Sequence, residues 1–374
     1  MSSRSLTEET SRQIVVCRVL CIFFMMSVHV SPGFDADDWS LHDPMHWVGA
    51  VWADVLGRSS VPTLSVISGF LLAVRPGRGT FGSFARKRLG VLIAPMLFWN
   101  AVLAAMVLAP AALLGHRTAT HRLFFEAPWP EVVFENLLFL YGSPANVPLA
   151  FLRDLFVCGL IVFLLLRHAR WALVPGLIAS VAAWMTTGYG ELLLRPSLLS
   201  FVLAGAVLGV HAGYLEPPRR LRPVTYGLLL LVVVGHWLAP LIGAEPPVPE
   251  PVERLIFRAI VTACVLDFAL LVARSRFFAV VSLYGPVAYL AYLSHSVVIS
   301  ALWEACEPLI GGSRGPLYVA FFLVTPAVVF AFARLAFPFI DRMPAWLQVL
   351  VRGKAAPGTR RPGEAPAPKT AATP

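Results

Sequence analysis

An arginine and a histidine share the first strongly apolar segment of the chain, and both could take part in chemistry there. Arg18 and His29 are eleven residues apart within VVCRVLCIFFMMSVHV. In a helix, this spacing brings the two residues back to within about 20° of each other and separates them by about 16 Å along the axis. One helix face would then carry a permanent cation and a titratable imidazole. An imidazole that titrates near neutral pH can act as a general base or carry an acyl group.

Both residues also have a structural interpretation, which the sequence leaves open. A histidine near the end of a membrane-spanning helix can hydrogen-bond a neighbour or reach the interface. An arginine about four residues from the inner end can extend its long side chain to the headgroups. The common face of Arg18 and His29 favours the functional interpretation.

Further ionisable residues fall inside apolar segments, where each costs several kcal/mol and therefore needs a partner or a function. They are Asp54, Arg58, Arg153, Asp154, Asp267 and His295. By depth, all but Asp267 share the outer half of the membrane with His29. Asp54 or Asp154 could orient the imidazole, as a carboxylate does in hydrolytic triads. Arg58 or Arg153 could stabilise an oxyanion or bind the carboxylate of a succinyl group.

Neighbours in sequence do not share a helix face, so we expect Arg153 and Asp154 each to find a partner elsewhere or to line a wet cavity. In the inner half, the triplet Arg86–Lys87–Arg88 could anchor a cytoplasmic loop or hold the phosphates of an anionic ligand. Ser68 precedes Gly69, and this pair of small residues could also serve close helix packing.

These residues must be positioned by membrane-spanning helices. Of 374 residues, 57% are hydrophobic and 14% are charged, against roughly a quarter charged in soluble domains. Together with a mean hydropathy of +0.73, this excludes a disordered chain, a disulfide scaffold and an ordinary cytosolic enzyme. It predicts an all-α polytopic membrane protein. A spanning helix needs about 20 mostly apolar residues, and about ten segments qualify: 14–32, 49–74, 89–115, 145–166, 171–187, 196–214, 224–243, 255–273, 277–303 and 316–340.

Loop charges predict that both termini are cytoplasmic. With that orientation, basic residues are about four times as frequent in the inner loops and tails as in the outer loops. The net charge of +9 is then explained by membrane orientation, and we expect no nucleic-acid partner.

The chain divides into a cytoplasmic segment (1–13), one membrane domain (14–340) and a cytoplasmic tail (341–374). Residues 352–374 are rich in Pro, Ala and charge, and the tail 341–374 is expected to be disordered. The five cysteines lack zinc-site spacing, and no Gly-rich nucleotide motif occurs. We therefore expect no metal and no tightly bound cofactor.

Five motifs in order resemble the acyltransferase-3 family of integral membrane acyltransferases. They are Arg18-x10-His29, VPTLSVISGFLL (61–72), FARKRLGVLIAP (84–95), LAFLRDLF (149–156) and YLAYLSHSVV (289–298). The resemblance runs from about residue 12 to 340, and Val91 stands where many members have a further arginine. The opening motif and FLRDLF are most similar to exopolysaccharide-modifying members that add succinyl or acetyl groups.

The resemblance implies transfer of an acyl group from cytoplasmic acyl-CoA, a co-substrate, to a carbohydrate across the bacterial inner membrane. It implies that His29 and Arg18 are required. It places Ser68 and the basic triplet near the donor, and His295 matches a late family histidine near the acyl group or the acceptor.

The sequence therefore predicts an O-acyltransferase whose partners are acyl-CoA, a polysaccharide or lipid-linked glycan, and the bilayer. The alternative is a transporter or flippase for an anionic or lipid-linked glycan, which would also need charged residues at mid-membrane. Transporters often contain internal repeats, and no convincing match between 1–187 and 188–340 is found. A third alternative is a sensor or scaffold. The oligomeric state is left open.

Overall fold

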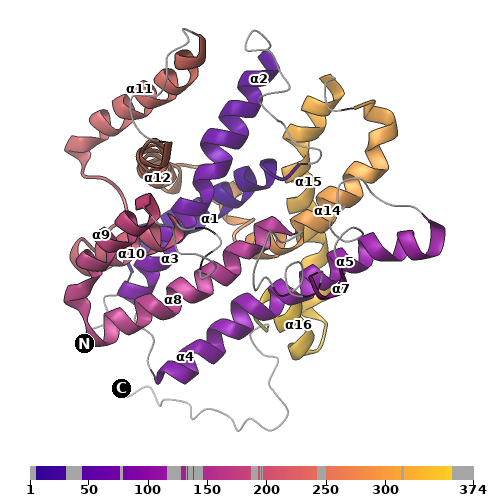
Figure 1. The fold of residues 1–374 in the computed structure, drawn as a ribbon, viewed down its shortest axis with the longest axis horizontal. Coiled ribbons are helices and arrows are strands. Elements are labelled where there is room, and N and C mark those ends of the chain that lie inside the picture. Colours follow the sequence, from indigo (N-terminus) through magenta and orange to yellow (C-terminus); the bar gives the residue numbers. More distant parts are fainter. Residues whose placement is uncertain are drawn as a thin grey trace.

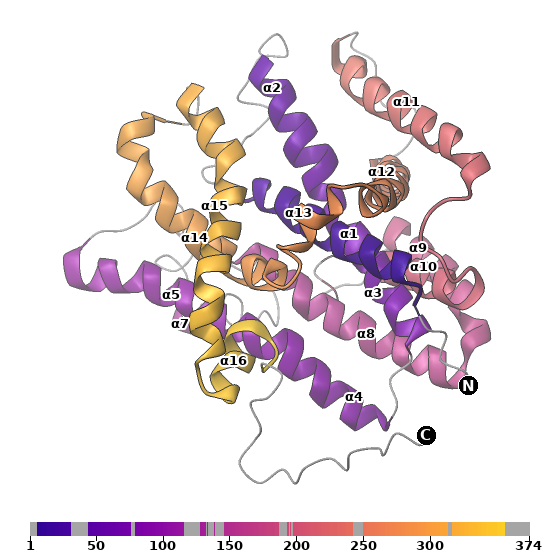
Figure 2. The same cartoon turned by 180° about the vertical axis from the view of Figure 1, so that it is seen from behind.

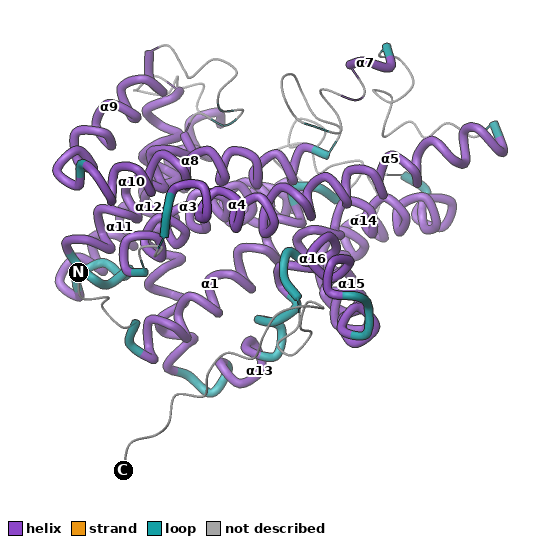
Figure 3. Tube along the Cα trace, turned by 90° about the horizontal axis from the view of Figure 1, so that it is seen from below, coloured by secondary structure: helices purple, strands orange, loops and turns teal. Residues whose placement is uncertain are grey.

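The computed structural model describes residues 6–30, 44–75, 79–115, 128–131, 133, 138, 146–186, 193, 195, 197–241, 250–312 and 316–355. Throughout these ranges the chain is helical, with turns and loops between helices and no β-strand (Figure 3). This agrees with the predicted all-α class.

The N-terminal part places two long helical segments against each other. Its elements are α1 (Glu8–Ser27), α2 (Pro44–Gly49), the π-helix η2 (Ala50–Gly57) and α3 (Arg58–Val74). The side chain of Thr7 caps α1 by accepting a hydrogen bond from Thr10 N at 3.1 Å. The π-helix ends one turn before Pro62, which has no N–H to complete an α-helical bond.

The middle part begins with one long helical segment, α4 (Phe81–Arg88), η3 (Leu89–Ile93) and α5 (Ala94–Leu114). The one-turn helix α7 (Trp129–Glu131) and the 3₁₀ turn η6 (Val147–Leu149) follow. They lead to α8 (Ala150–His168), η7 (Arg170–Ala172), α9 (Leu173–Thr186) and α10 (Ser197–His211). Helix α8 lies alongside α4 in Figure 1, and the two are in contact.

The C-terminal part comprises η9 (Arg219–Leu221), α11 (Arg222–Leu241), α12 (Glu250–Arg274), α13 (Phe278–Ser282), α14 (Ala288–Ile310), α15 (Pro316–Asp341) and α16 (Ala345–Arg352). Helix α11 lies at the periphery, beyond α12, in both views of the ribbon (Figures 1 and 2). Helices α14 and α15 pack against each other and against α1.

Within the described residues, six helical segments are long and apolar enough to cross a membrane. They are Glu8–Ser27, Trp47–Val74, Phe81–Leu113, Val147–His168, Pro251–Arg274 and Pro316–Asp341. These correspond to six of the ten predicted spans. The count of ten and the cytoplasmic location of both termini stay predictions.

Two predicted spans differ from the structure. The segment 277–303 is not one helix, because α13 ends at Ser282 and α14 begins only at Ala288. Gly285 and Pro286 occupy the turn between them, and a proline cannot donate the hydrogen bond that would continue the helix. The first span ends early, at Ser27 rather than at 32, so His29 follows the helix instead of belonging to it.

Glycines let α3 and α10 approach more closely than any other residue would allow. A Cβ atom at Gly69 would lie 1.8 Å from Val202 O, and one at Gly205 would lie 1.9 Å from Val66 O. Gly205 and Gly209 form a GxxxG pair on α10, the pattern by which membrane helices bring their backbones together. This contact fixes α3 against α10, and both helices contribute to the cavity described below.

The predicted tail is partly ordered. Helix α16 lies within 341–374 and packs against α5, α14 and α15. Its Arg352 is buried and pairs with Asp341 at 2.6 Å, and Trp99 Nε1 donates to Val351 O at 2.9 Å. An amphipathic face explains this order, whereas the overall composition suggested disorder. Residues after 355 lie outside the described part of the chain.

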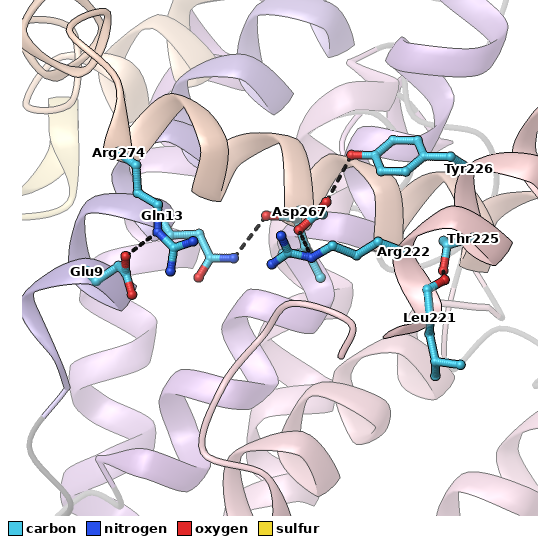
Figure 4. A network of polar contacts seen from close by, with 9 residues as sticks. Glu9, Gln13, Leu221, Arg222, Thr225, Tyr226, Asp267 and Arg274 are labelled. Atoms are coloured by element: carbon cyan, nitrogen blue, oxygen red, sulfur yellow. Dashed lines mark hydrogen bonds and ion pairs between the residues drawn. The ribbon is translucent and has the colours of Figure 1, made fainter. Parts of the chain in front are cut away.

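A polar network joins α1, α11 and α12 (Figure 4). The carboxylate of Asp267 on α12 pairs with Arg222 Nε at 2.9 Å and accepts a hydrogen bond from Tyr226 Oη at 3.1 Å. Gln13 Nε2 of α1 donates to Leu266 O at 2.9 Å, and Glu9 pairs with Arg274. Asp267 thus holds α11 against α12, which is a structural role.

Candidate active site

His29 lines a polar cavity of about 260 Å³ between α1, α3, α10 and α12. The residues around this His29 cavity come from segments far apart in sequence. They are Met25, Val28, His29, Gly57, Arg58, Val61, Pro62, Ser65, Val147, Arg195, Ser197, Leu198, Phe201 and Arg258. The cavity therefore exists only once the helices have assembled.

The end of α1 positions His29 at the cavity wall. Val28 keeps right-handed helical dihedral angles, and its N–H bonds to Met25 O and Met26 O. His29 N then donates to Met26 O at 2.9 Å. Gly57 lies opposite this turn, and a Cβ atom there would be 2.4 Å from Val28 Cγ2 and 2.8 Å from Phe24 O. Only glycine lets η2 approach the turn this closely.

Three arginines share the cavity with His29, and none of the described lining residues is acidic. Arg258 Nη1 donates to Ser197 Oγ at 3.3 Å, and Arg195 Nη2 donates to Val147 O at 3.0 Å. These acceptors are neutral. Burial lowers the pKa of Arg195, while Tyr292 and Asp154 raise it. Because arginine is not deprotonated in proteins, its guanidinium stays charged, and the cavity is suited to an anion.

The two carboxylates proposed to orient His29 are engaged by other groups. Asp54 Oδ1 accepts from Arg58 Nε at 2.6 Å, one turn along η2 and α3. Asp154 is fully buried, accepts from Arg195 N at 2.9 Å and pairs with Arg153 at 3.2 Å. The expectation that Arg153 and Asp154 would not pair with each other was wrong, because the long arginine side chain bends back to its neighbour. Neither carboxylate lines the His29 cavity.

His295 is the predicted residue that the structure does bring to His29. The two rings lie 5.6 Å apart, centroid to centroid, with an angle of 47° between their planes. His295 is fully buried on α14, and its Nδ1 lies 2.5 Å from Tyr292 O. Arg58 also reaches the cavity, whereas Arg153 does not line it.

The predicted donor-side residues lie elsewhere. Arg18 is exposed on α1 and does not line the His29 cavity, so the structure does not show the single shared face. Arg86 and Lys87 are exposed at the end of α4, while Arg88 stacks over the Phe84 ring at 5.4 Å. The hydroxyl of Ser68 donates to Leu64 O at 2.8 Å within its own helix.

Sequence reasoning missed two cavity residues, Arg195 and Arg258. Arg258 lies within the predicted span 255–273, so the rule that singled out Asp267 applies to it equally. Arg195 directly precedes the predicted span 196–214, and the predicted topology places it in an outer loop. No local pattern connects it to His29.

Residues 12–334 match the acyltransferase domain of the acyltransferase-3 family. The succinoglycan biosynthesis protein ExoH of Rhizobium meliloti (strain 1021) is 27% identical over 242 residues. That alignment covers 60% of this chain and 61% of ExoH, so it spans less than two thirds of the relative. No solved structure matches the chain. Because the family match covers most of its length, the chain belongs to the acyltransferase-3 family of membrane acyltransferases.

Proposed function

We propose that this protein transfers an acyl group from acyl-CoA to a sugar hydroxyl of an exported polysaccharide or glycolipid, in the inner membrane of a bacterium. The observation that carries the proposal is the His29 cavity, where an imidazole and three guanidinium groups converge. Family membership supplies the reaction class. The relative whose name refers to succinoglycan biosynthesis supports a polysaccharide acceptor.

In the proposed reaction, His29 takes the proton of the acceptor hydroxyl as its oxygen attacks the thioester carbonyl. The carbon–sulfur bond then breaks, and the CoA thiolate leaves and recovers a proton from the imidazolium. A nearby guanidinium stabilises the negative charge on the carbonyl oxygen. Transfer through an acyl-imidazole at His29 would use the same groups in two steps.

The excess of positive charge favours succinyl over acetyl as the transferred group. A succinyl group carries a free carboxylate, and arginine binds carboxylates with two parallel hydrogen bonds. Within the described chain, the guanidinium groups of Arg195 and Arg258 donate hydrogen bonds to the neutral acceptors Val147 O and Ser197 Oγ. The carboxylate of a succinyl group would neutralise part of the positive charge of these two arginines.

The donor is proposed to enter from the side that carries Arg86 and Lys87, which are exposed and can contact the CoA phosphates. Arg18, also exposed, would meet the donor between this entrance and His29. In this scheme Arg88 and Ser68 support the donor path through packing, since both side chains are engaged within the protein.

The test is the ester-linked acyl content of the cell-surface polysaccharide, measured by mass spectrometry. Three strains are compared: a deletion strain, the same strain complemented with wild type, and the strain complemented with His29→Ala at equal protein level. We expect the deletion to remove one acyl mass and only wild type to restore it, and the mass identifies the donor. A polysaccharide that keeps its acyl groups but fails to reach the surface would support the transporter instead.

A further inference from the structure

We propose that His295 is the residue that positions His29 for catalysis, in the place where hydrolytic triads use a carboxylate. The inference rests on the proposed acyl transfer and deepens it. A catalytic imidazole needs a fixed tautomer and orientation, so that one ring nitrogen faces the reacting hydroxyl. An acceptor on the other side of the ring supplies both.

The described residues offer His29 no carboxylate for this purpose. Asp54 is held by Arg58, and Asp154 is held by Arg153 and Arg195 N. The groups that share the cavity with His29 include three arginines, which are donors only. The ring that faces His29 is that of His295, from a helix 266 positions later in the chain.

The surroundings of His295 fix its tautomer. Its Nδ1 lies 2.5 Å from Tyr292 O, and a carbonyl oxygen can only accept, so Nδ1 carries the proton. Nε2 therefore carries a lone pair and is an acceptor. Nε2 is buried and has no hydrogen-bond partner among the described residues. Buried polar atoms are nearly always satisfied, so this lone pair points to an interaction that forms during function.

A stack of aromatic rings along α14 keeps His295 in place. Its ring stacks on Tyr292 at 5.7 Å, and Tyr292 stacks on Tyr289 at 6.2 Å. The two tyrosine hydroxyls donate to Pro148 O and Val91 O, each at 2.7 Å. The imidazole is thus held from both its ring face and its Nδ1 edge.

A second unsatisfied atom belongs to Asn146, which contacts the residue after His295. Asn146 is buried, its Oδ1 accepts from Ser296 Oγ at 2.8 Å, and its Nδ2 has no partner among the described residues. Ser296 is the neighbour of His295, and Asn146 directly precedes Val147 of the cavity wall. The open amide of Asn146 can donate to a bound hydroxyl or to a water.

With the centroids 5.6 Å apart, His29 reaches His295 Nε2 through one bridging water or by a small ring movement. The N–H of His29 then donates toward Nε2, and the opposite nitrogen of His29 takes the proton of the acceptor hydroxyl. His295 itself stays neutral throughout. It acts through His29 and does not touch the reacting atoms.

Two substitutions of similar polarity separate this role from a packing role. The amide of His295→Gln reaches the position of Nε2 and can still accept a hydrogen bond from His29. The amide of His295→Asn reaches only the position of Nδ1. The exposed His168→Asn at the end of α8 is the matched control. Each protein is purified in detergent. The assay uses succinyl-CoA as the donor. The acceptor is polysaccharide that is isolated from the deletion strain and then deacylated by mild alkali.

We expect kcat of His295→Gln to stay within about tenfold of wild type and kcat of His295→Asn to fall by about 100-fold. KM for succinyl-CoA should change by less than about threefold in both, because a positioning residue acts on the chemical step. His168→Asn should match wild type. If His295→Asn does not purify as a single species, His295→Met replaces it, because it matches Gln in length and lacks the acceptor.

Equal kcat values for the Gln and Asn variants near wild type would overturn the inference. Complete loss in both would also overturn it, by showing that His295 takes the proton itself. If wild type transfers no acyl group from succinyl-CoA or acetyl-CoA, the proposed function fails and the inference fails with it. The inference fails alone when wild type is active, His29→Ala is inactive and the two His295 variants do not differ.

Discussion

Charged side chains gather in two parts of the bundle, the His29 cavity and the network between α1, α11 and α12 (Figure 4). In the network, each cation has an anion: Arg222 pairs with Asp267, and Arg274 pairs with Glu9. In the cavity, Arg58 pairs with Asp54, whereas the guanidinium groups of Arg195 and Arg258 donate to the neutral acceptors Val147 O and Ser197 Oγ. The network thus pairs each of its cations with an anion, whereas two of the three arginines in the cavity hydrogen-bond to neutral acceptors and leave it positive.

The difference separates structure from function. A buried charge is costly unless it is paired, so a protein that only needs to hold helices together pairs its charges, as α11 and α12 do. Keeping Arg195 and Arg258 around one cavity costs stability, because like charges repel. Such a cost is typical of binding sites, where residues that are needed for activity lower the stability of the fold. Variants in the two regions should therefore have opposite effects.

The largest effect is expected from His29→Ala. Loss of a general base lowers turnover by about 10²- to 10⁴-fold, while thermal stability should change little because His29 is only half-buried. The measurement is CoA release from succinyl-CoA in the presence of deacylated polysaccharide, together with thermal unfolding of the same preparation in detergent. Full turnover in His29→Ala would show that the His29 cavity is not the site of acyl transfer.

Asp267→Asn should do the reverse. Asp267 is buried, and breaking a buried ion pair costs about 3–5 kcal/mol of stability. Turnover per folded molecule should stay within about twofold. Thermal unfolding in detergent measures the loss, and the double variant Asp267→Leu with Arg222→Met is the control, because removing both charges should restore much of the stability. If Asp267→Asn has normal stability but reduced turnover, the network takes part in the reaction rather than in holding the helices together.

Arg258→Gln should lower activity and raise stability at once. One guanidinium fewer in the cavity weakens binding of a carboxylate by about 1–3 kcal/mol, which corresponds to roughly a 5- to 140-fold rise in KM for succinyl-CoA. KM for acetyl-CoA should not change, and the midpoint of unfolding should rise. Arg276→Gln, an exposed arginine outside the cavity, is the control. An equal rise in KM for succinyl-CoA and acetyl-CoA would contradict a role of Arg258 in binding the carboxylate of the acyl group.

The comparison also shows which features the sequence could reveal. Composition and apolar runs were sufficient for the helical membrane class, because a membrane leaves few alternatives to apolar helices. His29 and His295 were both found, since an ionisable residue within an apolar segment can be recognised from the sequence alone. Asp54 and Arg58 are spaced i, i+4, so their pairing could have been predicted from the sequence.

Other features depend on how distant segments pack. The pairing of Arg195 N with Asp154 and of Tyr292 with Pro148 joins segments separated by 41 and 144 residues. No local pattern specifies such contacts. The end of α1 at Ser27 was missed because hydropathy continues to Val30, while the helix itself ends. Because the helix ends at Ser27, His29 lies in the following turn and lines the cavity instead of lying on a helix face.

The smallest effect concerns Tyr226, at the edge of the network. Tyr226→Phe removes one hydrogen bond to Asp267 and should cost about 1 kcal/mol of stability. In the Asp267→Asn background the same change should cost less, because the charged acceptor is gone. Tyr226 also lines an apolar cavity of about 340 Å³ with Leu20, Phe24 and Phe268, and the phenylalanine ring keeps that wall intact. Turnover should therefore equal wild type. A loss of turnover at unchanged stability would show that the hydroxyl serves the reaction, and the division between a balanced structural network and an unbalanced active cavity would no longer hold.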